Sequence, residues 1–293
     1  MPFPYLDEIQ QLDEKTRSAA DGSFIMLPAG TVHYELAGPT EAPVVVLVHG
    51  FSVPYFIFDP TFEFLVSAGY RVLRYDLFGR GWSDRPRLAN NIHLFVDQLC
   101  DLLDTLKIRS PITLTGLSMG GPITAAFTVQ HPQRVSRNVF IDPSGVHKLS
   151  LGGLSVGLVP GVGELVLGLF GSERLVKNIA SDFFDPALVE HFQARYRPQM
   201  RFAGFKRSIL STLRSGMLGD FSGVYQALSR LQKPTLIFWG REDTTVPFPH
   251  SADLAGILPL AELRVIEGCG HIPHYEKPEQ FNPALLSFLQ RGA

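Results

Sequence analysis

The stretch TLTGLSMGGP, residues 113–122, places Ser118 between an apolar run and a run rich in glycine. The residues before it have the composition of a buried strand, and MGGPITAAFTVQ after it predicts a helix that tolerates Pro122 in its first turn. Gly116 and Gly120 stand two residues to either side of the serine. This spacing at a strand-to-helix turn indicates a nucleophile elbow, which exposes the serine hydroxyl at the carboxyl end of a sheet. The other interpretation is an ordinary helix cap, for which the paired glycines have no purpose.

Short apolar runs recur along the chain and alternate with helical stretches. PVVVLVHG (43–50) is almost uniformly apolar and β-branched, as expected of a strand buried on both faces. Residues 24–38 predict a leading antiparallel hairpin that turns at residues 28–30. The alternation predicts an α/β fold with a mostly parallel, doubly wound sheet of eight strands. The other predicted strands are RVLRYD (71–76), ITLTG (112–116), RNVFID (137–142), TLIFWG (235–240) and LRVIEG (263–268), and the predicted helices are 92–107, 119–131, 248–257 and 279–290.

The alternation stops in a region that is first glycine-rich and apolar, and then aromatic and rich in arginine. It predicts a helical cap, 144–230, inserted after the sixth strand into an α/β core of residues 1–143 and 231–293. Residues 149–171 within it are numerous enough to span a membrane, but they include seven glycines, a proline and Glu164. Because an acid in lipid is costly and glycine weakens a helix, we expect no transmembrane segment. Peripheral contact between the cap and lipid stays open.

A serine nucleophile needs a base, and the base needs an acid that orients it. His271, in GCGHIPHYEKPEQF, follows the last predicted strand, where a loop can bring it over the elbow; His274 is the alternative. Asp243, in WGREDTTVP, follows the seventh strand and is the predicted acid, although aspartate is also common in turns. Asp142, after the sixth strand, is the alternative acid. The order Ser118, Asp243, His271 is the order expected of this elbow motif.

The oxyanion of such a site is held by two backbone N–H groups. One belongs to Met119, directly after the nucleophile, and the other to Phe51, in the loop LVHGFSVP after the third strand. Donors of this kind contribute roughly 3–4 kcal/mol each to the transition state. We therefore expect Phe51 and Met119 to form the oxyanion hole.

Charge and cysteine content narrow the possible partners. Lys plus Arg is 26 and Asp plus Glu is 28, so the net charge is −2 and gives no reason to expect nucleic acid binding. Cys100 and Cys269 match no metal spacing and are expected to be free thiols in a reducing compartment. The first residues are acidic by Asp7 and lack the apolar core of a signal peptide, so we expect a cytoplasmic protein. No metal and no organic cofactor are expected, and the oligomeric state stays open.

The segments LVHGF, YDLFGRGWSDRP, GLSMGG, WGREDTTVP and GCGHIPHYEKPEQF resemble those of α/β-hydrolase fold proteins, in the same order and over nearly the whole chain. The resemblance implies a triad of Ser118, Asp243 and His271. Haloalkane dehalogenases and epoxide hydrolases have aspartate at the elbow, so the serine points to capped carboxylesterases, monoacylglycerol lipases and enol-lactone hydrolases. Carbon–carbon bond hydrolases of meta-cleavage products share SMGG. They usually have asparagine before the serine and tryptophan after the histidine, where this chain has Leu117 and Ile272.

These observations predict a serine hydrolase that cleaves carboxylic esters with small to medium apolar groups through an acyl-enzyme. Apolar residues between 151 and 184 predict a pocket that suits an acyl or aromatic group. A lactone or a carbon–carbon bond is the alternative substrate for the same triad. A ligand-binding protein with the hydrolase fold is the alternative from another class.

Overall fold

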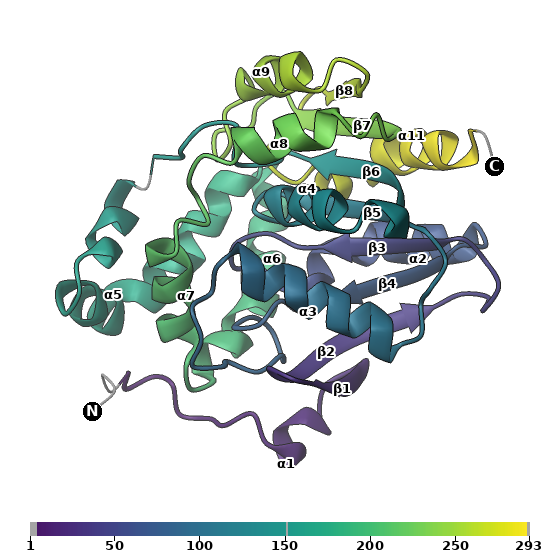
Figure 1. Cartoon of the computed structure of the whole chain (residues 1–293). Helices are drawn as coiled ribbons and strands as arrows, with labels where there is room; N and C mark the ends of the chain where they lie inside the picture. The colour runs from purple at the N-terminus through teal and green to yellow at the C-terminus, as the bar shows by residue number, and fades with distance from the viewer. Residues whose placement is uncertain (1–4, 151, 292–293) are drawn as a thin grey trace.

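The computed structural model describes residues 5–150 and 152–291. Its eight strands form one sheet in the order β1-β2-β4-β3-β5-β6-β7-β8 (Figure 1). β1 pairs antiparallel with β2, and β2 with β4, whereas the remaining pairs are parallel. The predicted mostly parallel sheet and its leading hairpin are therefore confirmed. The strands are β1 (Ser23–Leu27), β2 (Gly30–Ala37), β3 (Val44–Val48), β4 (Arg71–Tyr75), β5 (Ile112–Leu117), β6 (Val135–Ile141), β7 (Thr235–Gly240) and β8 (Glu262–Ile266).

Helices cover both faces of the sheet (Figure 1). One face carries α3 (Ile92–Thr105), α4 (Gly120–Gln130), α8 (Ser222–Ser229) and α9 (His250–Ile257). The other face carries α2 (Asp59–Ser67), α10 (Pro273–Glu276) and α11 (Pro278–Gln290). The short α1 (Glu14–Arg17) precedes the sheet, and 3₁₀ turns lie at η1 (Tyr55–Phe58) and η2 (Pro132–Arg134).

The core follows from the alternation of side chains along the buried strands. In β3, Val44, Val46 and Val48 pack on the side of α3 and α4. Val45 and Leu47 point the other way and pack on the side of α2 and α11. All five side chains are buried, which is why this strand reads as an unbroken apolar run.

The helix α2 was not among the predicted helices. It begins directly after the η1 turn, and Pro60 stands in its first turn, where proline is accepted. Its sequence, DPTFEFLVS, is short and begins with a dipeptide typical of turns. Packing of Phe62 and Leu65 against the sheet decides its conformation, and a local pattern does not report such packing.

Between β6 and β7 the chain forms α5 (Val162–Asn178), α6 (Val189–Tyr196) and α7 (Phe205–Arg214), beyond the carboxyl ends of the central strands (Figure 1). The turns η3 (Gly152–Leu158), η4 (Ile179–Asp182), η5 (Pro186–Leu188) and η6 (Arg197–Arg201) connect them. The helix α8 lies in the same region of sequence but packs on α4. The extent of the cap, 144–230, stays a prediction.

The apolar stretch 149–171 does not form one continuous helix, because it is divided between η3 and α5. None of the helices among the described residues combines the length and the apolar character that a membrane span requires. Cys100 and Cys269 are both free thiols, the second of them buried.

Candidate active site

Ser118 follows β5 directly and has a φ of 52°, in the left-handed region that non-glycine residues rarely adopt. Three backbone hydrogen bonds hold it there. Its N–H donates to the Ile141 carbonyl (2.9 Å), and its own carbonyl accepts from the N–H groups of Gly121 (2.8 Å) and Ser144 (3.1 Å). Strain of this kind costs about 1–3 kcal/mol and persists only where the surroundings impose it. The turn therefore has the conformation that the sequence pattern predicts for an elbow.

The glycines that flank the serine are required by backbone contacts. A Cβ atom on Gly116 would lie 2.3 Å from the Gly120 carbonyl oxygen. A Cβ atom on Gly120 would lie 2.4 Å from the carbonyl oxygen of Val48 and 2.8 Å from that of His49. Because any side chain at these positions would collide with the backbone, the start of α4 can approach β3 only with glycine there.

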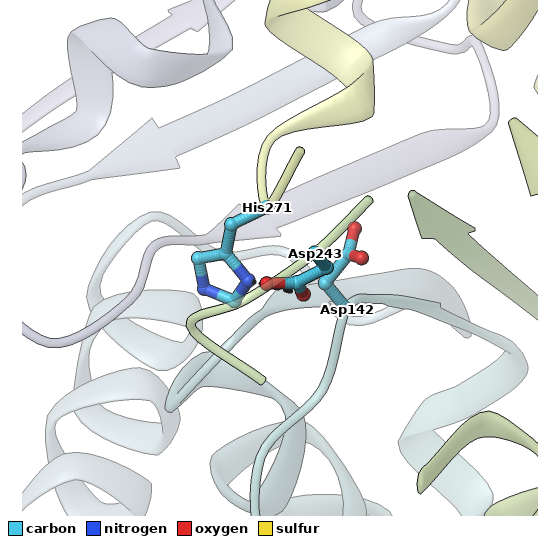
Figure 2. A group of neighbouring side chains, drawn as sticks. All are labelled: Asp142, Asp243 and His271. Atoms are coloured by element: carbon cyan, nitrogen blue, oxygen red, sulfur yellow. Dashed lines mark hydrogen bonds and ion pairs between the residues drawn. The ribbon is translucent and has the colours of Figure 1, made fainter. Parts of the chain in front are cut away.

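His271 lies in the loop between β8 and α10, and its Nδ1 is 2.7 Å from Oδ2 of Asp243 (Figure 2). The other oxygen of Asp243, Oδ1, accepts from the backbone N–H groups of Thr245 (2.8 Å) and Val246 (2.9 Å). Both side chains are buried. The carboxylate is thus fixed by the β7 loop and fixes the imidazole in turn, which is the relation between acid and base that a triad requires.

The electrostatics of His271 suit a base. Burial opposes protonation of the imidazole, but the charge of Asp243 and the hydrogen bond to it outweigh burial and raise the pKa of His271. Asp182, at the end of η4, adds to this effect. The backbone carbonyl of Asp182 also accepts a hydrogen bond from the backbone N–H of His271 (2.8 Å). The charges of Asp243 and Asp182 therefore both favour the protonated form of this imidazole.

Ser118 and His271 line the same cavity, whose volume is about 400 Å³. Among the hydrogen bonds of the described residues, none joins the Ser118 hydroxyl to the His271 imidazole, and such contacts often tighten only when substrate binds. The alternative base, His274, lies away from the cavity between Phe58 and Phe281. Burial lowers the pKa of His274 to about 3, so this residue is a neutral part of the core.

Met119 and Phe51 are the residues predicted to form the oxyanion hole. Phe51 lines the cavity beside Gly50, and Met119 follows the nucleophile directly at the N-terminus of α4. Within the described part of the chain, neither backbone N–H donates a hydrogen bond. Both N–H groups are thus available to a developing oxyanion.

Among the described residues, the alternative acid Asp142 forms no hydrogen bond with His271 and lies next to Asp243 (Figure 2). Asp142, Asp243 and His271 each have one oxygen or nitrogen that could bind a metal, and these three atoms lie within 4.8 Å of one another. Such a spacing also occurs in metal sites. However, both oxygens of Asp243 already accept N–H groups, and a metal ion would have to displace them. The N–H groups that Asp243 and Asp142 accept explain the places of the two acids without a metal.

Three further residues, Glu276, Asp182 and Arg174, have no pattern in the sequence that marks them as part of the site. Glu276 stands in the segment HYEKPEQF, and nothing in the sequence indicates its partners. In the structure its carboxylate accepts hydrogen bonds from the backbone N–H groups of Phe184, Asp185 (both 2.9 Å) and Gly270 (2.8 Å). Asp182 and Arg174 reach the cavity from the region between β6 and β7. Their places depend on how that region folds over the sheet, which local patterns do not report.

The arrangement contains the parts of an acyl-transfer site: a hydroxyl at a strained elbow, an imidazole oriented by a carboxylate, two backbone N–H groups without a partner among the described residues, and a partly open cavity. The model of the alpha/beta hydrolase family matches residues 45–284. The chain belongs to the alpha/beta hydrolase family.

Individual relatives narrow the comparison. The chain is 31% identical over 227 residues to 2-hydroxymuconate semialdehyde hydrolase of Pseudomonas sp. (strain CF600). This alignment covers 75% of this chain and 76% of the relative. It is 30% identical to 2-hydroxy-6-oxononadienedioate/2-hydroxy-6-oxononatrienedioate hydrolase of Paraburkholderia xenovorans (strain LB400), over 92% of this chain and 96% of the relative. Both relatives are hydrolases, and the chain spans most of each.

Solved structures agree with this grouping. The meta-cleavage product hydrolase CumD of Pseudomonas fluorescens IP01 superposes with a TM-score of 0.77 at 26% identity, over 93% of this chain and 98% of that structure. The enol-lactonase of Burkholderia xenovorans LB400 superposes with a TM-score of 0.78 at 20% identity, over 92% of this chain and all of the enol-lactonase. The second likeness shows the fold alone.

Proposed function

We propose that this protein is a serine hydrolase of the meta-cleavage product type, which cleaves a carbon–carbon bond next to a ketone in a substrate that carries a carboxylate. The observation that carries the proposal is a cavity lined by Ser118, His271 and Arg174, in a chain about 30% identical to hydrolases of such substrates. This choice favours the alternative from sequence analysis over a general ester hydrolase.

In the proposed reaction, His271 takes the proton of Ser118 as its hydroxyl oxygen attacks the ketone carbon. The N–H groups of Phe51 and Met119 hold the oxyanion of the tetrahedral adduct. For this bond to break, the dienol of the substrate must first tautomerise to its keto form, which makes the carbon next to the ketone saturated. When the adduct collapses, the electron pair of the broken carbon–carbon bond is then delocalised as an enolate, and His271 protonates this fragment. Water, deprotonated by the same imidazole, then hydrolyses the acyl-enzyme and restores the serine.

Arg174 is the residue that supports an anionic substrate. Its side chain lies against Gly153 and lines the cavity, and it forms no ion pair with any of the described residues. The names of the relatives' substrates, dienoates and dienedioates, denote carboxylates. A guanidinium group matches a carboxylate in shape and charge and binds it through two hydrogen bonds.

An ester or lactone substrate is the second candidate, and Leu117 and Ile272 favour it. Both side chains line the cavity at the positions where hydrolases of meta-cleavage products usually have asparagine and tryptophan. Apolar walls next to the nucleophile and the base suit an apolar ester. The chemistry at Ser118 is the same for both candidates.

Two substrates separate the candidates: 2-hydroxy-6-oxo-6-phenylhexa-2,4-dienoate and the neutral ester p-nitrophenyl butyrate. We expect the higher kcat/KM on the dienoate, and loss of both activities in Ser118→Ala. Arg174→Gln should raise KM for the dienoate about tenfold or more and leave the ester unchanged, with Arg174→Lys as the charge-retaining control. A higher kcat/KM on the ester, insensitive to Arg174, would identify an esterase instead. Activity in Ser118→Ala would reject both candidates.

A further inference from the structure

The second acid of the site, Asp142, has features that a turn residue does not need. It is fully buried directly after β6 and has a φ of 41°, a strained conformation that aspartate tolerates better than most residues. Its N–H donates to the Phe238 carbonyl (3.0 Å), and its Oδ1 accepts from the Gly240 N–H (2.8 Å). It therefore joins the ends of β6 and β7 immediately before the loop that carries Asp243.

The second oxygen of Asp142, Oδ2, decides its charge. If both acids were ionised, this buried atom would have no hydrogen-bond donor within the described residues, and it would face the carboxylate of Asp243. An unpaired buried carboxylate is costly, and two like charges at this separation oppose each other. A proton on Oδ2 removes both costs, because Asp142 then donates a hydrogen bond to Asp243.

The proton belongs on Asp142 and not on Asp243, because the two acids differ in their donors. Asp243 accepts two backbone N–H groups and the imidazole N–H of His271, whereas Asp142 accepts one N–H group. Hydrogen bonds from donors favour the charged form of an acid. Burial, with the charge of Asp243 next to it, raises the pKa of Asp142 well above its ordinary value.

The other titratable groups around the pair act in the same direction. Glu276, from α10, adds to the rise in the pKa of Asp142, and burial together with the charges of Asp243 and Glu276 raises the pKa of Asp182, from η4. Among the groups that act on Asp182, only His271 acts in the opposite direction by its charge. A further negative charge on Asp142 would add to repulsion that His271 alone cannot balance.

We propose that Asp142 is a positioning residue of the active site: a neutral carboxylic acid that donates a hydrogen bond to the carboxylate of Asp243 and holds it against Nδ1 of His271. Asp142 does not touch the substrate. Its role depends on the proposed function of the triad, since it acts through Asp243.

Two substitutions separate a neutral donor from a charged or a merely structural residue. Asp142→Asn keeps an oxygen for the Gly240 N–H and an amide N–H for Asp243, so kcat should stay within about twofold and the acid limb of the kcat/KM profile should not move. Asp142→Gly suits the positive φ but loses both contacts, so kcat should fall about ten- to a hundredfold at an unchanged KM, with the protein folded. Circular dichroism and the melting temperature check the fold.

Infrared difference spectroscopy tests the protonation state without turnover. At pH 7 the spectrum of the native protein minus that of Asp142→Asn should contain the carbonyl stretch of a protonated carboxylic acid, and the same band should appear in a Ser118→Ala background. Absence of the band overturns the proposal. So does an acid limb that moves to lower pH in Asp142→Asn, since this would mean that the substitution removed a charge. Unchanged kcat in Asp142→Gly would also overturn it. If Ser118→Ala stays active while the band is present, the proposed triad is wrong and the protonation of Asp142 is not.

Discussion

The strained elbow predicts that Ser118 lowers the stability of the protein while providing its activity. Ser118→Ala and Ser118→Gly both remove the hydroxyl, so they differ only in how well the backbone accepts a φ of 52°. The left-handed conformation costs an L-residue about 1–2 kcal/mol, whereas glycine adopts it freely but loses about 0.5–1 kcal/mol more entropy on folding. The glycine variant should therefore be the more stable by about 0.5–1 kcal/mol, which raises Tm by about 1–3 °C.

Differential scanning calorimetry of the two variants at the same pH and scan rate measures this difference. Both variants should lose more than about a thousandfold in kcat, because neither has a nucleophile. The reasoning is refuted if the glycine variant melts at or below the temperature of the alanine variant, because the turn would then carry no strain. Substantial turnover by either variant would refute the assignment of the nucleophile.

Three other predictions follow from the site and its supports. Asp243→Asn should lower kcat about ten-thousandfold with little change in fold, because the imidazole loses the acceptor that fixes its tautomer; a loss below tenfold would contradict this role. In the native protein, kcat/KM should fall as the pH decreases through the raised pKa of His271, above about 6.5, and in Asp243→Asn this limb should move to lower pH; a pH-rate profile measures both. Gly120→Ala should destabilise the protein by about 1–3 kcal/mol in thermal melts, because its Cβ would meet the backbone of Val48, whereas Gly256→Ala, in open space on α9, should stabilise it by about 0.5–1 kcal/mol; equal effects would show that the elbow is not crowded.

Much of the fold could be predicted from the sequence because its strands are buried on both faces. A strand such as β3, with every side chain buried, reads as a continuous apolar run whatever surrounds it. The elbow could be located for a similar reason, since the crowding at Gly116 and Gly120 excludes every side chain and leaves a local pattern. The order of Ser118, Asp243 and His271 along the chain then limited where the partners could lie.

Features that depend on contacts between distant segments could not be predicted. The helix α2 is determined by packing against the sheet and against α11, more than 200 residues away. The sequence left Asp142 as a possible acid, but its neutral state depends on Asp243, which lies 101 positions further along the chain. Glutamate is a residue type that usually lies on the surface, so the sequence gives no sign that Glu276 binds three backbone N–H groups in the folded chain.

The bonds of Glu276 have a consequence for how substrate reaches the site. Through one carboxylate, the backbone at residues 184–185 is fastened to Gly270, next to His271, so this segment cannot move away without breaking these bonds or displacing that loop. We expect the cavity to open instead where η3 and the C-terminal half of α5 line it. Backbone amides of Gly152–Leu158 should then exchange hydrogen faster than those of Phe184 and Asp185. The reverse order would place the entrance to the cavity near residues 184–185 instead.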